Sequence, residues 1–253
     1  KYSYGLKEIS LPRVLNEDLA FIVGSYDSDG SRIPDEFSPH GKGIRIAVAS
    51  NRPEDLQRLI LAIRRCFNIQ PKIRRGDGEV TIIQAFSRRL NEFLKLNGLL
   101  KEYSINVRVP ELIFSSPRRV VEAYIAGVFL GDGTNRGGKG GLRITTVSKE
   151  FARDLQLLLL NLGIPSKIKI QLRKEKNWRT IYTVTVNGAT FMKRFLNLLT
   201  PYTEKVFDKK ASVRDGFFGW PFNMVERFLY LSHFQRTQAR TNPTTSQKSV
   251  LFL

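Results

Sequence analysis

A ten-residue pattern that ends in Asp-Gly occurs twice in this chain, once in each half. The first copy is Phe-Ile-Val-Gly-Ser-Tyr-Asp-Ser-Asp-Gly at residues 21–30, and the second is Tyr-Ile-Ala-Gly-Val-Phe-Leu-Gly-Asp-Gly at residues 124–133. Apolar residues recur at helical spacing in both copies, so each predicts a helix that stops at its acid. The duplication predicts two equivalent halves related by a pseudo-twofold axis, where Asp29 and Asp132 would meet. Carboxylates that meet in this way attract divalent metal ions.

The duplication extends well beyond these ten residues. Gly-Ile-Arg-Ile-Ala-Val-Ala-Ser at 43–50 corresponds to Gly-Leu-Arg-Ile-Thr-Thr-Val-Ser at 141–148, and Asp-Leu-Gln follows both, at 55–57 and 154–156. Alternating apolar and polar residues predict strands in the first pair of segments, and amphipathic patterns predict a helix after each strand. We therefore expect a mixed α/β fold made of two pseudo-symmetric αββαββα halves.

The repeat also sets the expected organisation of the chain. Residues 1–99 form the first half, residues 100–116 a linker and residues 117–200 the second half. Residues 201–253 lie beyond the repeat and are expected to form a C-terminal helical extension. This extension either packs on the second half or contacts DNA through Arg227, Arg236 and Arg240.

The composition is strongly basic and poor in metal-binding soft ligands. Lys and Arg total 41 against 23 Asp and Glu, for a formal net charge of +18, which favours a polyanionic partner such as nucleic acid. One cysteine and two histidines exclude a disulfide scaffold and a Cys/His zinc site. We expect Cys66 in the core and a reducing compartment, either cytoplasm or organellar matrix, with no secretion.

The hydropathy of the chain bears on a membrane location, and its first residue bears on targeting. No apolar run approaches the roughly 18–20 residues needed to span a bilayer, so no membrane partner is expected. The chain begins at Lys1 without a methionine, so the native N-terminus is missing or processed and targeting signals cannot be judged.

The two copies of the pattern resemble the paired signature of LAGLIDADG homing endonucleases, in the single-chain form that carries both halves. The resemblance covers roughly residues 15–200, and the first copy departs from the family pattern at Ser28, where glycine is usual. It implies a monomeric, magnesium-dependent endonuclease that cuts both strands of double-stranded DNA at a specific site. It also implies a homing role for a mobile intron or intein.

The pattern itself supplies physical reasons for such a site. Gly24 and Gly127 lack side chains at mid-helix, so the two helices can approach backbone to backbone and bring their C-terminal ends together. Asp29 and Asp132 would then share two or three Mg²⁺ ions, with the carbonyl groups of Ser28 and Gly131 as further oxygen ligands. Asp27 competes with Asp29 for the metal, but alignment with the second copy selects Asp29. We expect Asp27 to be solvated or salt-bridged.

Polar and basic side chains near the metals are expected to position water and neutralise the phosphate. The family resemblance assigns this role to the residues after the first long strand of each half and to one basic residue after the last strand. These are Asn51, Arg52, Ser148, Lys149 and Arg88, with Thr190 and Lys193 near the position equivalent to Arg88 in the second half.

The strands are expected to form a saddle whose open face lies in the major groove. Many of its side chains would contact only phosphate, which gives affinity without sequence information. Because the halves have diverged, the preferred duplex should be long and asymmetric. The expected DNA contacts are Arg45, Lys72, Arg74, Arg143, Lys167, Lys169, Gln171 and Arg173.

Two other functions fit the same scaffold. One is an RNA-binding maturase that assists the splicing of an intron, and the other is a DNA-binding regulator that cuts nothing. The presence of both acids favours the enzyme over the regulator, whereas a maturase function is compatible with cleavage.

Overall fold

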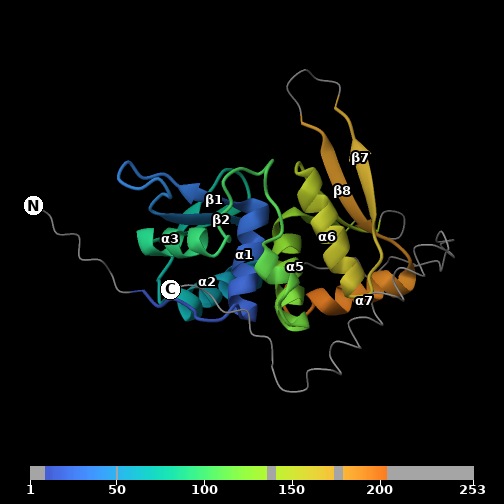
Figure 1. Cartoon of the computed structure of the whole chain (residues 1–253), viewed down its shortest axis with the longest axis horizontal. Helices are drawn as coiled ribbons and strands as arrows, with labels where there is room; N and C mark the ends of the chain where they lie inside the picture. Colours follow the sequence, from blue (N-terminus) through green and yellow to red (C-terminus); the bar gives the residue numbers. More distant parts are fainter. Residues whose placement is uncertain (1–8, 50, 136–140, 174–178, 204–253) are drawn as a thin grey trace, which may run out of the picture.

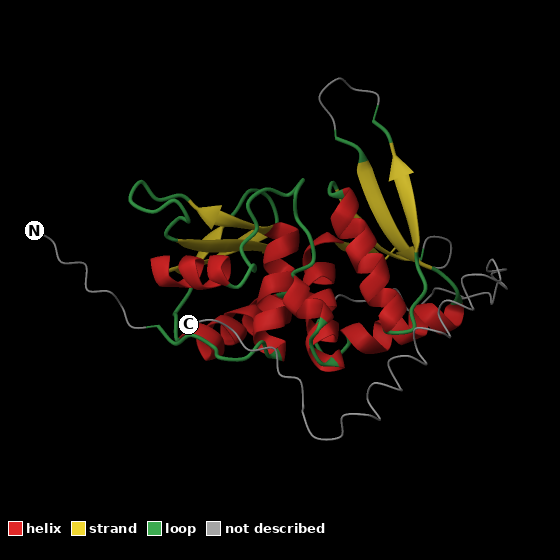
Figure 2. Ribbon diagram, in the orientation of Figure 1, coloured by secondary structure: helices red, strands yellow, loops and turns green. Residues whose placement is uncertain are grey.

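The two halves contain the same elements in the same order (Figures 1 and 2). A computed structural model describes residues 9–49, 51–135, 141–173 and 179–203. The first half comprises α1 (Glu17–Asp29), β1 (Gly30–Ile33), β2 (Gly43–Ala49), α2 (Pro53–Phe67), β3 (Lys72–Arg75), β4 (Val80–Phe86) and α3 (Arg88–Leu96). The second half comprises α5 (Arg118–Asp132), β5 (Gly133–Asn135), β6 (Leu142–Thr146), α6 (Lys149–Asn161), β7 (Lys167–Gln171), β8 (Ile181–Val186) and α7 (Ala189–Leu199). The predicted αββαββα order is confirmed.

Each half builds one four-stranded antiparallel sheet. The strand orders are β1-β2-β4-β3 and β5-β6-β8-β7, which are equivalent positions in the two halves. The registers are equivalent too. Cross-strand neighbours in the first sheet are Ser31, Arg45, Gln84 and Lys72, and in the second sheet Thr134, Arg143, Thr185 and Lys167.

One face of each sheet packs against helices and the other faces solvent. In β2, Ile44, Ile46 and Val48 are at most 4% exposed, because they point towards the helical layer. The alternate residues Arg45 and Ala47 are exposed or half-buried on the opposite face. Most charged residues of the strands therefore lie on the open face, as their spacing predicted, whereas Arg32 and Arg75 have the orientation of Ile44 and Val48.

Helices α1 and α5 lie side by side at the centre, with the two sheets on either side of them (Figure 1). The linker joins the halves as an ordered segment that contains the short helix α4 (Glu111–Phe114) and buries Val107, Val109 and Ile113. Cys66 is buried in the core, as expected. Among the described residues, no helix has the length and apolar character required to cross a membrane.

Part of the expected C-terminal extension cannot be compared with the structure. Residues 204–253, including Arg227, Arg236 and Arg240, lie outside the described residues. The division of the chain at positions 99, 116 and 200 remains a prediction.

Candidate active site between the paired helices

The central contact between α1 and α5 depends on the two glycines. A Cβ atom on Gly24 would collide with the carbonyl oxygen of Tyr124, and one on Gly127 would collide with the carbonyl oxygen of Phe21. On Gly127 it would also lie 2.8 Å from the amide nitrogen of Ser25. The helices therefore touch backbone to backbone, which only glycine permits at these positions.

This contact brings the C-terminal ends of the two helices together. Both helices end at the acid of the pattern, at Asp29 and Asp132. A Cβ atom on Gly131 would lie 2.9 Å from Oδ2 of Asp29, so the Asp29 carboxylate lies against the residue that precedes Asp132. Asp29 is exposed and Asp132 is half-buried. The acids are therefore close to each other and open to a ligand.

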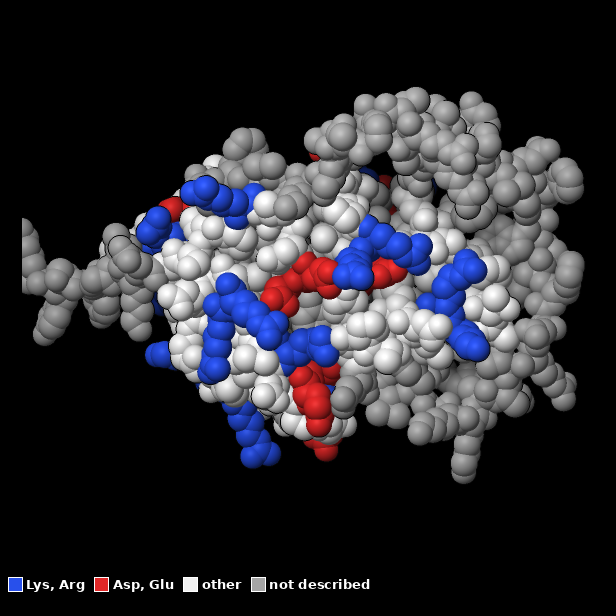
Figure 3. Space-filling model, turned by 90° about the horizontal axis from the view of Figure 1, so that it is seen from below, with Lys and Arg blue, Asp and Glu red and all other residues white. Residues whose placement is uncertain are grey.

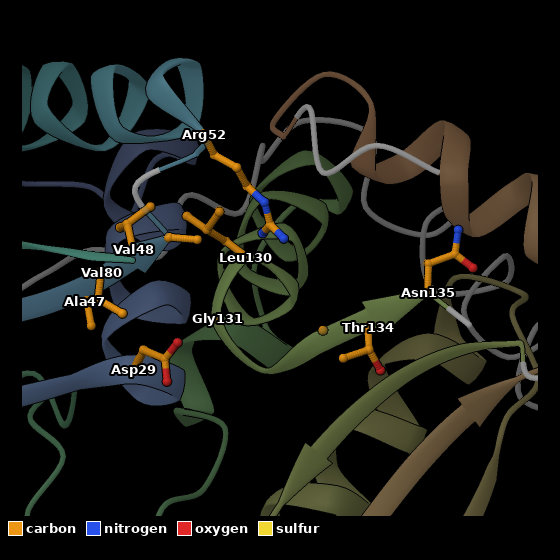
Figure 4. Close-up of a pocket in the computed structure, with 11 residues that line it drawn as sticks. Asp29, Ala47, Val48, Arg52, Val80, Leu130, Gly131, Thr134 and Asn135 are labelled. Atoms are coloured by element: carbon orange, nitrogen blue, oxygen red, sulfur yellow. The ribbon is translucent and has the colours of Figure 1, made fainter. Parts of the chain in front are cut away.

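A cavity of about 450 Å³ opens beside the Asp29 carboxylate. It lies between the first sheet and the start of the second, and its lining includes Arg52, Gly131, Thr134 and Asn135. Figure 4 shows the Arg52 side chain reaching from the start of α2 towards the end of α5, while the Asp29 carboxylate points towards Gly131. An anionic group in this cavity would meet Arg52 on one side and a cation held by the acids on the other.

Lys101 is a site residue that the sequence reasoning missed. Its side chain is buried, and Nζ donates hydrogen bonds to the carbonyl oxygens of Asp27 at 2.9 Å and Ser28 at 3.2 Å. Burial lowers the pKa of the Lys101 ammonium, while the negative charges of Asp27, Asp132 and Asp29 raise it. The linker thus supplies a cation beside the acids of both halves.

The Lys101 backbone is anchored as well. The Tyr26 hydroxyl donates to the Lys101 carbonyl at 3.1 Å, and the Lys101 ammonium lies 5.6 Å from the centroid of the Tyr26 ring. No sequence signal marks this lysine, since Leu-Lys-Glu in a charged connecting segment is typical of a solvated linker. Only the tertiary contact identifies it.

The prediction that Asp27 is solvated or salt-bridged is wrong. Asp27 is 5% exposed, and its Oδ2 accepts a 2.7 Å hydrogen bond from the Tyr124 hydroxyl of the other half. Burial raises the pKa of the Asp27 carboxyl to about 7, against the lowering effects of the Tyr124 hydrogen bond and Lys101. The residue points into the helix interface because α5 covers that side of α1.

The predicted polar and basic residues are not all near the acids. Arg52 is half-buried in the cavity, and Asn51 is exposed in the turn before it. In the second half Lys149 is exposed at the first position of α6.

Ser148, by contrast, is 2% exposed and its hydroxyl is used structurally. It accepts a hydrogen bond from the Phe151 amide at 3.2 Å as the N-cap of α6, and donates one to the Val107 carbonyl at 2.7 Å. These contacts leave its hydroxyl committed to the helix and the linker.

Arg88 lies beyond the end of the first sheet that is remote from the acids. It forms an ion pair with Asp35 and lies 5.6 Å from the centroid of the Phe37 ring. The strand before it ends at Phe86, which pairs with Gly43 at the opposite end of β2 from Ala49. Ala49 lines the cavity with Asp29 and Arg88 does not.

Thr190 and Lys193 are also remote from the acids. They line a second cavity together with Glu17 and Arg118, which are the first residues of α1 and α5. They therefore lie at the opposite end of the paired helices from Asp29 and Asp132. Of the basic positions suggested after the last strands, none comes close to the acids, and Lys101 lies there instead.

The expected DNA contacts lie on the strands as the pattern predicted, except Arg173, which follows the end of β7. Those on the strands share the open face of the two sheets. All the expected contacts are exposed except the half-buried Arg143. Arg45 is oriented by a 2.6 Å hydrogen bond from its Nε to the Ser31 hydroxyl. The expected DNA contacts are Arg45, Lys72, Arg74, Arg143, Lys167, Lys169, Gln171 and Arg173.

The underside of the molecule has a different charge pattern. Seen from below, Asp and Glu form a band across the middle, with Lys and Arg on both sides of it (Figure 3). Arg118, near the N-terminal ends of the paired helices, forms an ion pair with Glu122. This mixed surface is less suited to a polyanion than the open faces of the sheets.

Comparison with known proteins identifies the architecture. Residues 119–200 match the family model described as a LAGLIDADG-like domain. The second half is therefore similar to a LAGLIDADG-like domain, and the two halves together have the fold of a LAGLIDADG homing endonuclease.

Two solved structures share this fold. The homing endonuclease I-DmoI in complex with DNA and Mn aligns with a TM-score of 0.52 and 17% identity, over 73% of this chain and 97% of that one. Full-length WhiA from Thermotoga maritima aligns with a TM-score of 0.51 and 14% identity, over 88% of this chain and 68% of that one.

Two curated relatives are much longer proteins. The chain is 24% identical over 218 residues to a glutamine–fructose-6-phosphate aminotransferase of Methanocaldococcus jannaschii, covering 86% of this chain and 19% of the relative. It is 33% identical over 156 residues to a DNA polymerase of Thermococcus kodakarensis, covering 62% of this chain and 9% of the relative. The chain thus spans less than a fifth of either relative.

The role of Ser148 can be tested by Ser148→Ala. Loss of the cap and of the buried hydrogen bond to Val107 is expected to lower the free energy of unfolding by about 2 kcal/mol. The DNA cleavage that the sequence predicts should not change per folded molecule. The matched control is Ser87→Ala, since Ser87 caps α3 through Leu90 and should cost only about 1 kcal/mol. A loss of cleavage without a loss of stability in Ser148→Ala would contradict this assignment.

Proposed function

We propose that this protein is a site-specific endonuclease that hydrolyses both strands of a long, asymmetric DNA duplex in a reaction dependent on divalent metal. One observation carries the proposal: the backbone contact of α1 and α5 sets the Asp29 carboxylate against Gly131, next to Asp132. This pair of acids lies between two sheets whose open faces are basic. Carboxylates near each other, at a surface fitted to a polyanion, suit metal-assisted phosphodiester hydrolysis.

The residues present fit a hard divalent cation. Asp29 and Asp132 would hold it, with carbonyl oxygens of Gly131 and Ser28 as further ligands. The Ser28 carbonyl already accepts a hydrogen bond from Lys101 but has a second lone pair available. No group of three His, Cys, Asp or Glu side chains gathers within the described ranges, so water and phosphate would complete the ligand shell. When bound, Mg²⁺ would stabilise the charge of the in-line displacement and help to activate water.

The protein's own cations have distinct tasks in this proposal. Arg52 binds a phosphate of the DNA strand that enters the cavity beside Asp29, and this contact fixes the orientation of the phosphate. Lys101 lies beside the two acids, and its positive charge stabilises the negative charge that develops at the phosphate. The exposed lysines and arginines of the sheets bind the flanking phosphates and the base edges.

The known relatives support a divalent metal and DNA. Structures of I-DmoI contain its target DNA in the presence of Mn or Mg, and another contains DNA and Ca. For the present chain, the preference for Mg²⁺ over other divalent ions remains part of the proposal. A monomeric state and binding to intron RNA also remain predictions.

A homing role for a mobile intron or intein is proposed on a separate ground. The chain matches a small part of an aminotransferase and of a DNA polymerase, two proteins whose named activities share no chemistry. A segment common to such unrelated proteins is more simply explained by an inserted element than by the activity of either.

The test is cleavage of a plasmid library that carries randomised duplex inserts. Purified protein with Mg²⁺ is expected to linearise only the members that contain its site, and EDTA should stop the reaction. Because several basic residues contact phosphate, binding should weaken steeply with rising salt concentration. Failure to cut any member with Mg²⁺ or Mn²⁺ would contradict the proposal.

A DNA-binding protein that does not cut is the second candidate. The similarity to WhiA over 88% of the chain favours it. This similarity means that the fold also occurs in a protein other than the endonuclease I-DmoI. The same library separates the two functions. Selective binding of one duplex without nicking would support the second candidate, and tight binding to a structured intron RNA would favour the maturase.

Lys101→Met tests the residue that the linker contributes. We expect cleavage to slow by about 10²-fold at saturating DNA, because a cation next to the developing charge is lost. The dissociation constant of the duplex should change little, since this buried side chain cannot contact the flanking phosphates. The matched control is Lys95→Met, because Lys95 forms a surface ion pair with Glu102. Equal cleavage rates for the two variants would show that Lys101 has no role in the site.

A further inference from the structure

The rows of side chains next to the acids differ in chemistry between the two sheets. In the first sheet Ala47, Ile82 and Arg74 are cross-strand neighbours. The equivalent row of the second sheet is Thr145, Thr183 and Lys169. The edge strands β3 and β7 thus both carry a cation in this row. The central strands carry hydrocarbon side chains in the first half (β2 and β4) and hydroxyl groups in the second (β6 and β8).

The next row towards the acids is apolar in both sheets, with the half-buried Ile181 of the second sheet at the position equivalent to Val80. In this row of the first sheet Ala49 pairs with Val80, and both are half-buried on the open face. We call Ala47, Ala49, Val80 and Ile82 the inner apolar patch. Three of its members, all except Ile82, line the cavity that contains Asp29. In Figure 4, Ala47 and Val80 lie on the same side of the cavity as Asp29.

The surroundings of the inner apolar patch indicate a nucleic-acid occupant. Arg45, Lys72 and Arg74 are exposed on the same face, in the same or the adjacent row. An apolar protein segment would gain nothing from these cations, whereas the phosphates of a duplex would pair with them. The patch would then face base edges rather than phosphate.

Only one base edge in the major groove offers an apolar group. The thymine C5-methyl packs favourably on alanine and other hydrocarbon side chains, whereas the edges of a G·C pair present donors and acceptors. The inner apolar patch has no side-chain hydrogen-bonding group, so polar groups of either pair would be unpaired against it, and only an A·T pair offsets this with a methyl contact. Thr145 and Thr183 offer a hydroxyl as well as a methyl group and accommodate either pair.

We propose that the inner apolar patch selects thymine methyl groups at the base pairs nearest the cleaved bonds in the half-site read by the first sheet. In the other half-site, the base pair that faces the Thr145–Thr183 row carries no such requirement. This inference rests on the proposed function, since it concerns the duplex that the protein cuts.

The experiment begins with selection of bound duplexes from a randomised double-stranded library in Ca²⁺. In the selected duplex, each thymine near the centre is then replaced by uracil, which removes only the methyl group. Loss of one buried methyl is expected to weaken binding about fourfold at the inner positions of one half-site. A replacement of the DNA alone cannot be confused with misfolding of a protein variant.

Ile82→Ser assigns the effect to the first sheet, with Thr183→Ser as the matched control at the equivalent position of the second. The uracil penalty should disappear at one or two positions in Ile82→Ser and persist in Thr183→Ser. Circular dichroism and thermal unfolding check that both variants fold.

The outcomes separate the inference from the proposed function. A library from which no duplex is enriched would overturn both. A selected duplex with G·C pairs at the inner positions of both half-sites, or with no uracil penalty that depends on Ile82, would overturn the inference alone.

Discussion

Replacing Asp29 or Asp132 by asparagine is expected to slow DNA cleavage by about 10³-fold or more while leaving duplex binding nearly unchanged. Each carboxylate is one of two acidic ligands for the proposed metal, whose stabilisation of the reacting phosphate is worth several kcal/mol. The DNA contacts on the sheets are untouched. The measurement is single-turnover cleavage with saturating protein, alongside binding in Ca²⁺.

Asp27→Asn is the matched control within the same pattern. Asparagine has the shape of Asp27 and can still accept the hydrogen bond from the Tyr124 hydroxyl through its carbonyl oxygen. Cleavage should therefore stay within about tenfold of the unmodified protein. If Asp27→Asn abolished cleavage while Asp29→Asn retained it, the assignment of the acids would be wrong.

Gly127→Ala is expected to lower the free energy of unfolding by about 3 kcal/mol. Alanine has the higher helix propensity by about 1 kcal/mol, so propensity alone would stabilise the variant. The added Cβ, however, collides with the Phe21 carbonyl and lies 2.8 Å from the Ser25 amide nitrogen, and backbone cannot move aside as a flexible side chain would. The steric cost is larger, at about 4 kcal/mol, because the collision is with backbone and so exceeds the 1–3 kcal/mol that is typical of overpacking.

Thermal unfolding measures this effect. A loss of this size corresponds to a fall in Tm of roughly 6–12 °C for a chain of this length. Gly78→Ala serves as the comparison, since a Cβ on Gly78 meets nothing within 4 Å and only its positive φ of 64° disfavours alanine. If Gly127→Ala were as stable as the unmodified protein, the backbone contact between the helices would be refuted.

The duplication made the architecture predictable from sequence. Because both halves repeat the same order of patterns, the element order, the open face of the sheets and the close approach at Gly24 and Gly127 could all be anticipated. The structure also brings Asp29 to Gly131, as the pseudo-twofold argument required.

The side chains whose surroundings come from distant parts of the chain could not be anticipated. Asp27 is buried because a helix about a hundred residues later covers it, and periodicity within α1 does not contain that information. Lys101 acquires its place through carbonyl groups of α1 rather than through any motif. Ser148 satisfies a helix cap and a linker carbonyl, which a strand-to-helix boundary cannot distinguish from a polar role in a site.

Arg88 illustrates a different limit. It follows the last strand of its half in sequence, which suggested a central position, but the antiparallel register takes that strand end away from the acids. Its ion pair with Asp35 also depends on the loop after β1, whose path the sequence does not specify. The direction of a strand, and not only its existence, decides whether its last residue reaches the centre.

The most direct test of the account is the position of manganese in crystals of the protein with its selected duplex, measured by anomalous scattering. We predict a Mn²⁺ peak within ligand distance of both the Asp29 and the Asp132 carboxylates, next to a phosphate of the bound DNA. Peaks that contact only one of these acids, or none, would contradict the claim that the two halves share one metal-binding site.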